Sequence, residues 1–202
     1  MSDARQFVAE EDYRAAIREY MKATTAFDAA EKGSRAAAVK ARIDSLQFAA
    51  LDPGNYQIAS TKLSTINSEV VNDPSVAQDA AEEALLRFNL ALAKGWEMSA
   101  GSRRAKAEVF KNQSESIKAQ VAVKNLYAEA KAVWDAAAVA QAAGRHEDSA
   151  PLFDEAEGRF MVVYEIAATK KVAAEAAMRE AAEKAAESSA ILEQGDAILA
   201  GE

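Results

Sequence analysis

The chain has 202 residues, half of them hydrophobic, and a formal charge of −8. Alanine supplies much of the apolar content and aromatic residues only 7%, a composition typical of helices packed closely on helices. The negative charge disfavours nucleic acid as a partner, because it repels a phosphate backbone. The absence of cysteine excludes disulfides, thiolate chemistry and cysteine-ligated metal sites. No apolar run is long enough to predict a membrane span.

Residues 1–11 are a polar lead-in, and the first expected helix then extends to about Ala50. Its apolar residues recur at steps of three and four, which places them on one helical face: Tyr13, Ala16, Ile17, Tyr20, Ala23, Phe27, Ala30, Ala37 and Ala41. The sequence Asp52-Pro53-Gly54-Asn55 predicts a turn, and a helix rich in Ser and Thr should follow over about 56–71.

Asp73 followed by Pro74 predicts an N-cap with proline at the first helical position. The next helix, over about 75–99, is apolar around most of its circumference, so we expect it in the core. Its large residues are Leu85, Leu86, Phe88, Leu90, Leu92 and Trp96. Gly101-Ser102 then predicts another turn.

Residues 102–143 contain neither proline nor glycine, so one long helix is possible there. However, Phe110, Ile117 and Val121 share one helical face, whereas Leu126 and Trp134 lie on roughly the opposite face. We therefore expect a break within 112–122. The alternative is one continuous helix packed on different neighbours at its two ends.

Gly144 predicts the last turn, and Pro151 cannot lie deep in a helix without a kink, so the final helix should start near Asp148 or Ser149. Its apolar stripe has heptad-like steps: Phe153, Ala156, Phe160, Val163, Ala167, Ala174, Met178, Ala181, Ala185 and Leu192. Beyond about residue 170 the stripe is mostly alanine, which makes a weak seam.

Four turns are each followed by a larger apolar residue, and in the first, second and fourth cases a small residue lies four positions before it. The third case matches only at Gly101 and Phe110. The larger residues are Tyr20, Leu63, Phe110 and Phe153, spaced by 43, 47 and 43 positions. This pattern resembles the second half of a tetratricopeptide repeat, G-x-Y-x-x-A-x-x-x-F-x-x-A, although that family repeats every 34 residues or so. The resemblance implies a single all-helical domain of repeat-like units over 12–52, 54–100, 101–143 and 144–200.

The first of these units begins at its second helix, so it is either a half-repeat cap or the remainder of a unit trimmed upstream. Residues 126–190 also resemble Ala/Glu-rich helical proteins of bacterial envelopes. If a signal or lipid anchor preceded the chain, we expect a periplasmic or envelope location, and otherwise a cytoplasmic one.

No catalytic, cofactor-binding or metal-binding residues are expected. His146 is the single histidine, and the chain contains no phosphate-binding loop, nucleophile elbow or zinc-protease motif. Trp96 and Trp134 are expected in the core. A peptide groove would use the tyrosines Tyr13, Tyr56 and Tyr127, with Asn112 and Asn125 binding a ligand backbone.

The predicted fold is all-α, with antiparallel helix-turn-helix pairs stacked as a short array or elongated bundle and a long C-terminal helix. The predicted function is a non-enzymatic scaffold that binds a protein or peptide, without a cofactor. The alternative is a structural protein that self-assembles through the C-terminal helix. A third possibility is a helical bundle that carries a small ligand.

Overall fold

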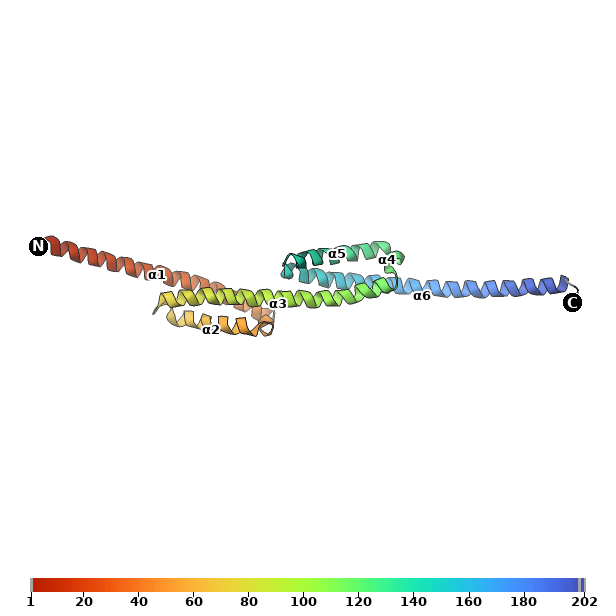
Figure 1. Ribbon diagram of the computed structural model, residues 1–202, viewed down its shortest axis with the longest axis horizontal. Helices are drawn as coiled ribbons and strands as arrows, with labels where there is room; N and C mark the ends of the chain where they lie inside the picture. Colours follow the sequence, from red (N-terminus) through yellow and green to blue (C-terminus); the bar gives the residue numbers. More distant parts are fainter. Residues whose placement is uncertain (1, 200, 202) are drawn as a thin grey trace. The chain divides into compact units, whose positions relative to one another are not determined.

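The computed structural model describes residues 2–199 and Gly201, with side chains described from Asp12 onward except that of Ala197. The described residues form six α-helices and one short 3-10 helix, with no strand among them (Figure 1). The predicted all-α class and long C-terminal helix are therefore confirmed. The chain divides into two compact units, residues 1–99 and 100–202.

Unit 1 is a three-helix bundle. It contains α1 (Ser2–Ser45), η1 (Phe48–Ala50), α2 (Pro53–Glu69) and the first part of α3 (Pro74–Ser116). Within this unit α2 runs back beside the second half of α1, and the first half of α1 extends beyond it (Figure 1). The core is built mainly from alanine around a few large side chains: Ala36, Ile43, Phe48, Ala59, Ile66, Ala80, Ala81, Ala84, Phe88 and Ala91.

Unit 2 repeats this plan with the second part of α3, α4 (Ala119–Ala122), α5 (Lys124–Ala142) and the first part of α6 (His146–Leu199). In Figure 1, α5 lies along the first part of α6. The core residues are Ala107, Ala119, Val123, Ala130, Trp134, Ala137, Phe153, Ala156, Phe160, Val163 and Ala167. Trp134 belongs to this core and Trp96 packs against the core of unit 1, as predicted.

Both units change direction in the same way after their first helix. Gln47 and Lys118 each adopt a left-handed conformation with φ of 58°, and a short helical turn follows before the second helix. Side chains other than glycine, asparagine and aspartate adopt this conformation infrequently. Because this conformation occurs at the same position in both units, the two loops share one backbone conformation there.

The correspondence between the two units also holds for their buried residues. At a shift of 71 residues, the first and second helices pair buried residues with buried residues: Ala29 with Ala100, Ala36 with Ala107, Ala59 with Ala130, and Ile66 with Ala137. The third helices pair at a shift of 72: Ala84 with Ala156, Phe88 with Phe160, and Ala91 with Val163. The extra residue falls between the second and third helices, where a change of length is tolerated.

Polar contacts repeat at the same shifts. Lys32 on the first helix of unit 1 pairs with Glu82 on the third at 2.6 Å. In unit 2 the corresponding residues, Arg103 and Asp154, also form an ion pair. The chain thus contains two versions of one three-helix unit, and α3 is the third helix of one and the first helix of the other.

Several helix ends follow the sequence signals. The carboxylate of Asp73 accepts a hydrogen bond from the backbone N–H of Val76 at 3.3 Å, which confirms the predicted cap before Pro74. Gly144 has a φ of +74° at the predicted turn. The expected break within 112–122 is confirmed by the end of α3 at Ser116 and by Lys118.

Other expectations at this level are wrong. The turn predicted at Gly101 does not exist, because α3 continues through it to Ser116; a glycine costs a helix only about 1 kcal/mol, too little to stop it without a proline. The final helix starts at His146, two residues before the predicted start, and takes Pro151 into its first turns. Leu86 and Leu90 are exposed, so α3 is not buried all round.

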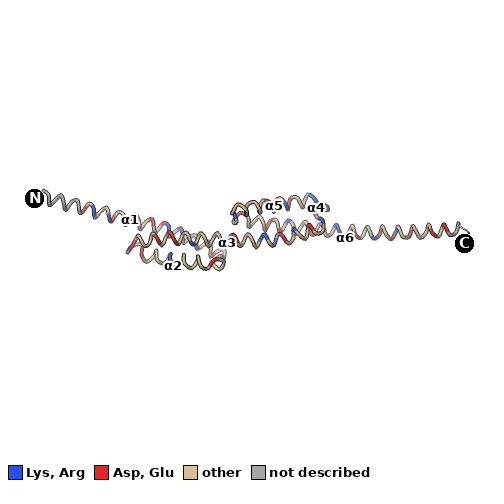
Figure 2. The backbone as a smooth tube through the Cα atoms, viewed as in Figure 1, with Lys and Arg blue, Asp and Glu red and all other residues tan. Residues whose placement is uncertain are grey.

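The apolar stripe expected on the first helix is not the face that packs. Tyr13, Tyr20 and Phe27 are all at least 70% exposed, whereas the buried residues of α1 include Ala29 and Ala36. Charged side chains of both signs are interspersed along the described helices (Figure 2), and most ion pairs join residues three or four apart on one helix. Such exposed pairs contribute little to stability.

The two cores differ by a compensating exchange of volume. A Cβ added to Gly95 in α3 would lie 2.2 Å from Cδ2 of Phe48, so the Phe48 ring occupies the space that the glycine leaves. The corresponding residues of unit 2 are Ala119 and Ala167, both buried. Unit 1 thus has a phenylalanine beside a glycine where unit 2 has two alanines.

We predict that Gly95→Ala lowers the free energy of unfolding by about 1–3 kcal/mol, because the added methyl overpacks against Phe48. Gly101→Ala is the matched control in the same helix. Nothing lies within 4 Å of its added Cβ, so this variant should be about 1 kcal/mol more stable than the parent. Urea unfolding of both variants checks the prediction, and equal stabilisation by the two substitutions would contradict it.

Candidate interaction surface

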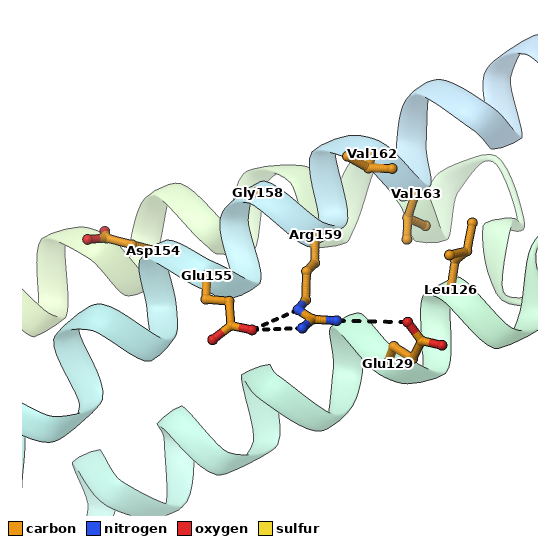
Figure 3. Close-up of a pocket in the computed structure, with 8 residues that line it drawn as sticks. All are labelled: Leu126, Glu129, Asp154, Glu155, Gly158, Arg159, Val162 and Val163. Atoms are coloured by element: carbon orange, nitrogen blue, oxygen red, sulfur yellow. Dashed lines mark hydrogen bonds and ion pairs between the residues drawn. The ribbon is translucent and has the colours of Figure 1, made fainter.

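A groove of about 520 Å³ lies between α5 and α6 in unit 2. It is lined by Leu126 and Glu129 from α5 and by Asp154, Glu155, Gly158, Arg159, Val162 and Val163 from α6 (Figure 3). α5 and the first part of α6 pack together around Phe153 and Phe160. The groove is therefore the outer edge of a well-packed helix pair.

The floor of the groove is apolar and is open at one point. Val163 is buried, whereas Leu126 and Val162 remain 38% and 44% exposed. Gly158 lies on α6 four residues before Val162, and nothing lies within 4 Å of the position that a Cβ would take. A small apolar side chain from another molecule would fit this opening and cover both exposed residues.

The rim of the groove is acidic. Glu129, Asp154 and Glu155 supply three carboxylates against the one guanidinium of Arg159. Arg159 lies 2.8 Å from Glu155 on the same helix and 3.8 Å from Glu129 on α5 (Figure 3). Asp154 pairs with Arg103 of α3, so three carboxylates and two guanidinium groups leave the rim with one excess negative charge.

The equivalent face of unit 1 has an arginine at the same position, but a leucine stands where unit 2 has Gly158. Arg87 corresponds to Arg159 and lies 3.6 Å from Glu83, and its guanidinium donates a hydrogen bond to Asn55 at 3.1 Å. Leu86, 57% exposed, occupies the position of Gly158. The two units thus share their cores but differ on this surface, and the open groove belongs to unit 2.

Two of the three tyrosines predicted to bind a partner, Tyr56 and Tyr127, occupy equivalent positions in the two units. The hydroxyl of Tyr56 donates a hydrogen bond to Asp44 at 2.5 Å, and its ring packs edge-on against Phe88 with centroids 5.8 Å apart. Lys40 pairs with the same carboxylate at 2.8 Å. These hydrogen bonds, that of Lys40 first, hold the pKa of Asp44 below its ordinary value.

Unit 2 contains the same arrangement. Tyr127 donates to Glu115 at 2.5 Å and packs edge-on against Phe160 with centroids 5.7 Å apart, while Lys111 pairs with Glu115 at 2.8 Å. The bonds from Lys111 and Tyr127 lower the pKa of Glu115. Burial, followed by the bond to Glu115, raises the pKa of Tyr127 to about 12. Both half-buried tyrosines therefore have a structural role, as ties from the second helix to the first.

The other predicted partner-binding residues lie elsewhere. Asn112 and Asn125 are exposed on α3 and α5, and Tyr13 is 70% exposed on α1. Asn125 lines a second pocket of about 410 Å³ with Leu126 and Lys170 among its neighbours. None of the five predicted residues lines the groove at Gly158, and their role in partner binding stays a prediction.

The described residues contain no group of three or more histidine, aspartate or glutamate side chains placed to hold a metal ion. No described helix is long and apolar enough to cross a membrane. His146 is half-buried at the start of α6, where its backbone carbonyl accepts a hydrogen bond from the hydroxyl of Ser149 at 3.0 Å.

Comparisons with protein families, with curated proteins and with solved structures gave no match for this chain.

Sequence reasoning missed the groove and the true period of the repeat, although a signal for the period exists. Glu-Ala-x-x-Arg-Phe occurs at 83–88 and again at 155–160, and Lys-x-x-x-acid-Ser-aliphatic occurs at 40–46 and 111–117. These segments contain the core phenylalanine, the groove arginine and the tyrosine-bound carboxylate of each unit. Their spacing of 72 and 71 residues identifies both units without a structure.

We predict that Tyr127 ionises near pH 12 in a titration followed by tyrosinate absorbance. Because its pKa is raised on folding from about 10, its contribution to stability is complete below pH 10 or so and is lost as the pH rises toward 12. Tyr127→Phe should remove the step near pH 12 and Tyr13→Phe should leave it in place. Persistence of the step in Tyr127→Phe would show that the assignment is wrong.

Proposed function

We propose that the protein is a non-enzymatic scaffold that binds a helical segment of a protein partner in the groove between α5 and α6. The observation that carries the proposal is the open space at Gly158, in a groove that the exposed Leu126 and Val162 also line. Amphipathic helices bind in apolar grooves through side chains spaced three and four residues apart. A segment with a small apolar residue facing Gly158 would use this mode.

Charge narrows the kind of partner. Glu129, Asp154 and Glu155 surround an apolar floor, so a segment with lysine or arginine beside its apolar face would be favoured over an acidic one. The presence of two equivalent helical units supports the proposal in a general way, because helical repeat proteins bind partners on the surfaces of their stacked helices. The partner expected here is a basic, amphipathic helix.

A second candidate function, a structural protein that self-assembles through its C-terminal helix, has a separate observation in its favour. Every side chain of α6 from Lys171 to Gln194 is exposed, although the same helix contributes Phe153 and Phe160 to the core of unit 2. A long helix segment without packing partners is marginally stable in water and gains from a partner.

Gly158→Leu tests the scaffold proposal, because it gives unit 2 the residue that unit 1 has at this position. The variant should fold normally, since the added side chain meets open space. The natural lack of cysteine allows a fluorophore on Val162→Cys to report binding of a synthetic amphipathic peptide with leucines on one face and lysines on the other. We predict saturable binding that Gly158→Leu weakens at least about tenfold, near 1.4 kcal/mol.

Two controls accompany this experiment. Leu86→Ala removes a side chain from the corresponding face of unit 1 and should leave peptide binding unchanged. A peptide with glutamates in place of the lysines should bind more weakly, and added salt should reduce that difference. Equal binding of both peptides, or full binding by Gly158→Leu, would contradict the proposal.

A further inference from the structure

The first and last parts of the described chain resemble parts of a three-helix unit whose other helices are not among the described residues. The relevant segments are residues 12–27 of α1, called the head segment, and residues 172–199 of α6, called the tail segment. The head segment is mostly exposed, and the tail segment is exposed up to Gln194. Both continue helices whose remaining parts are packed in unit 1 and unit 2.

Because α3 belongs to both units, it shows how the buried residues of a third helix and of a first helix are spaced along one helix. As the third helix of unit 1, α3 buries Ala84 and Ala91; as the first helix of unit 2, it buries Ala100 and Ala107. Each residue of the second pair follows its counterpart by sixteen positions. At 3.6 residues per turn this is a rotation of about 160°, so the two buried faces lie on nearly opposite sides of the helix.

The same relation holds in α1. Ala29 and Ala36 are buried in unit 1, and sixteen positions before them are Tyr13 and Tyr20, which are 70% and 75% exposed. Ile17 lies between these tyrosines, four positions after one and three before the other, as Phe88 lies between Ala84 and Ala91. The head segment therefore carries an aromatic stripe on the face that a third helix would bury, with no helix of unit 1 covering it.

The tail segment stands in the corresponding relation to unit 2. Val172, 66% exposed, follows buried Ala156 by sixteen positions, as Ala100 follows Ala84. Arg179 takes the next equivalent position, where its long aliphatic stem can cover apolar surface. Met178 beside it is 73% exposed. The tail segment thus corresponds to the first helix of a unit, and among the described residues no third helix packs against it.

Charge favours the meeting of these two segments over the pairing of like segments. The head segment has three basic and two acidic side chains, and the tail segment has two basic and six acidic side chains. Two tail segments would repel one another, whereas a head and a tail attract. A first and a third helix of one unit also exchange ion pairs in this protein, as Lys32 does with Glu82.

We propose that the tail segment of one copy packs along the head segment of a second copy, so that copies of the chain join head to tail. This inference deepens the self-assembly candidate by naming both surfaces. It does not involve the groove, so Gly158→Leu should leave self-association unchanged. Because no second helix completes the contact, the association should be weak and should grow with protein concentration. A heterologous contact of this kind forms open chains unless a ring closes.

Two full-length variants test the proposal by light scattering. The head variant carries Ile17→Glu and Tyr20→Glu, and the tail variant carries Val172→Glu and Met178→Glu. All four residues are more than 40% exposed, so folding should be unaffected, which helical circular dichroism checks. We expect the mass of the parent protein to rise with concentration, each variant alone to be monomeric, and an equal mixture to form dimers that grow no further.

The mixture is decisive because the head variant keeps an intact tail and the tail variant keeps an intact head. Val71→Glu with Val139→Glu, at exposed positions outside both segments, is the control and should associate like the parent. Dimers of the head variant alone would indicate tail-to-tail pairing, and dimers of the tail variant alone would indicate head-to-head pairing. Either result, a monomeric mixture, or a parent protein whose mass is independent of concentration would overturn the proposal.

Discussion

Each unit depends on a few large side chains packed among alanines where three helices meet. Phe88 and Phe160 occupy equivalent positions and are fully buried, and alanine or valine lies three or four positions away on the same helix. Small side chains let the helices approach closely, but they bury little surface, so the few large buried side chains supply much of the available apolar contact. A core of this kind gives up about 3–5 kcal/mol when such a ring is removed.

This constraint explains why other features recur in both units. The edge-on tyrosine needs the phenylalanine as its neighbour, and its hydroxyl then reaches a carboxylate on the first helix. Where one unit places a larger residue, another position becomes smaller, as with Phe48 and Gly95 against Ala119 and Ala167. The interior is thus held nearly constant, and the differences that could separate the functions of the two units lie on their surfaces.

Local signals made several elements predictable. Asp73-Pro74 and Gly144 set helix ends through their own backbone chemistry, and both were predicted from the sequence. The turn expected at Gly101 was wrong because one exposed glycine is a weak breaker in a helix of good helix formers. The repeat period was missed because alanine is so frequent that several spacings give similar matches, and only the less common residues, such as Arg87 with Phe88, distinguish the true one.

The candidate surfaces could not be predicted in the same way. The groove requires the pairing of α5 with α6 and a glycine on its outer edge, and neither is a property of one helix. The aromatic stripe beginning at Tyr13 was recognised, but its exposure depends on which face of α1 meets α2 and α3. In the sequence, the buried Ala29 and Ala36 form a weaker hydrophobic pattern than the exposed Tyr13 and Tyr20.

The central claim is that two equivalent three-helix units share the uninterrupted helix α3. Amide hydrogen exchange of the full chain at low protein concentration tests it most directly. We predict matched slow exchange in peptides from 56–66 and 127–137 and from 84–91 and 156–163, continued protection across 97–107, and fast exchange over 172–199. Fast exchange around Gly101, or protection confined to one unit, would contradict the account.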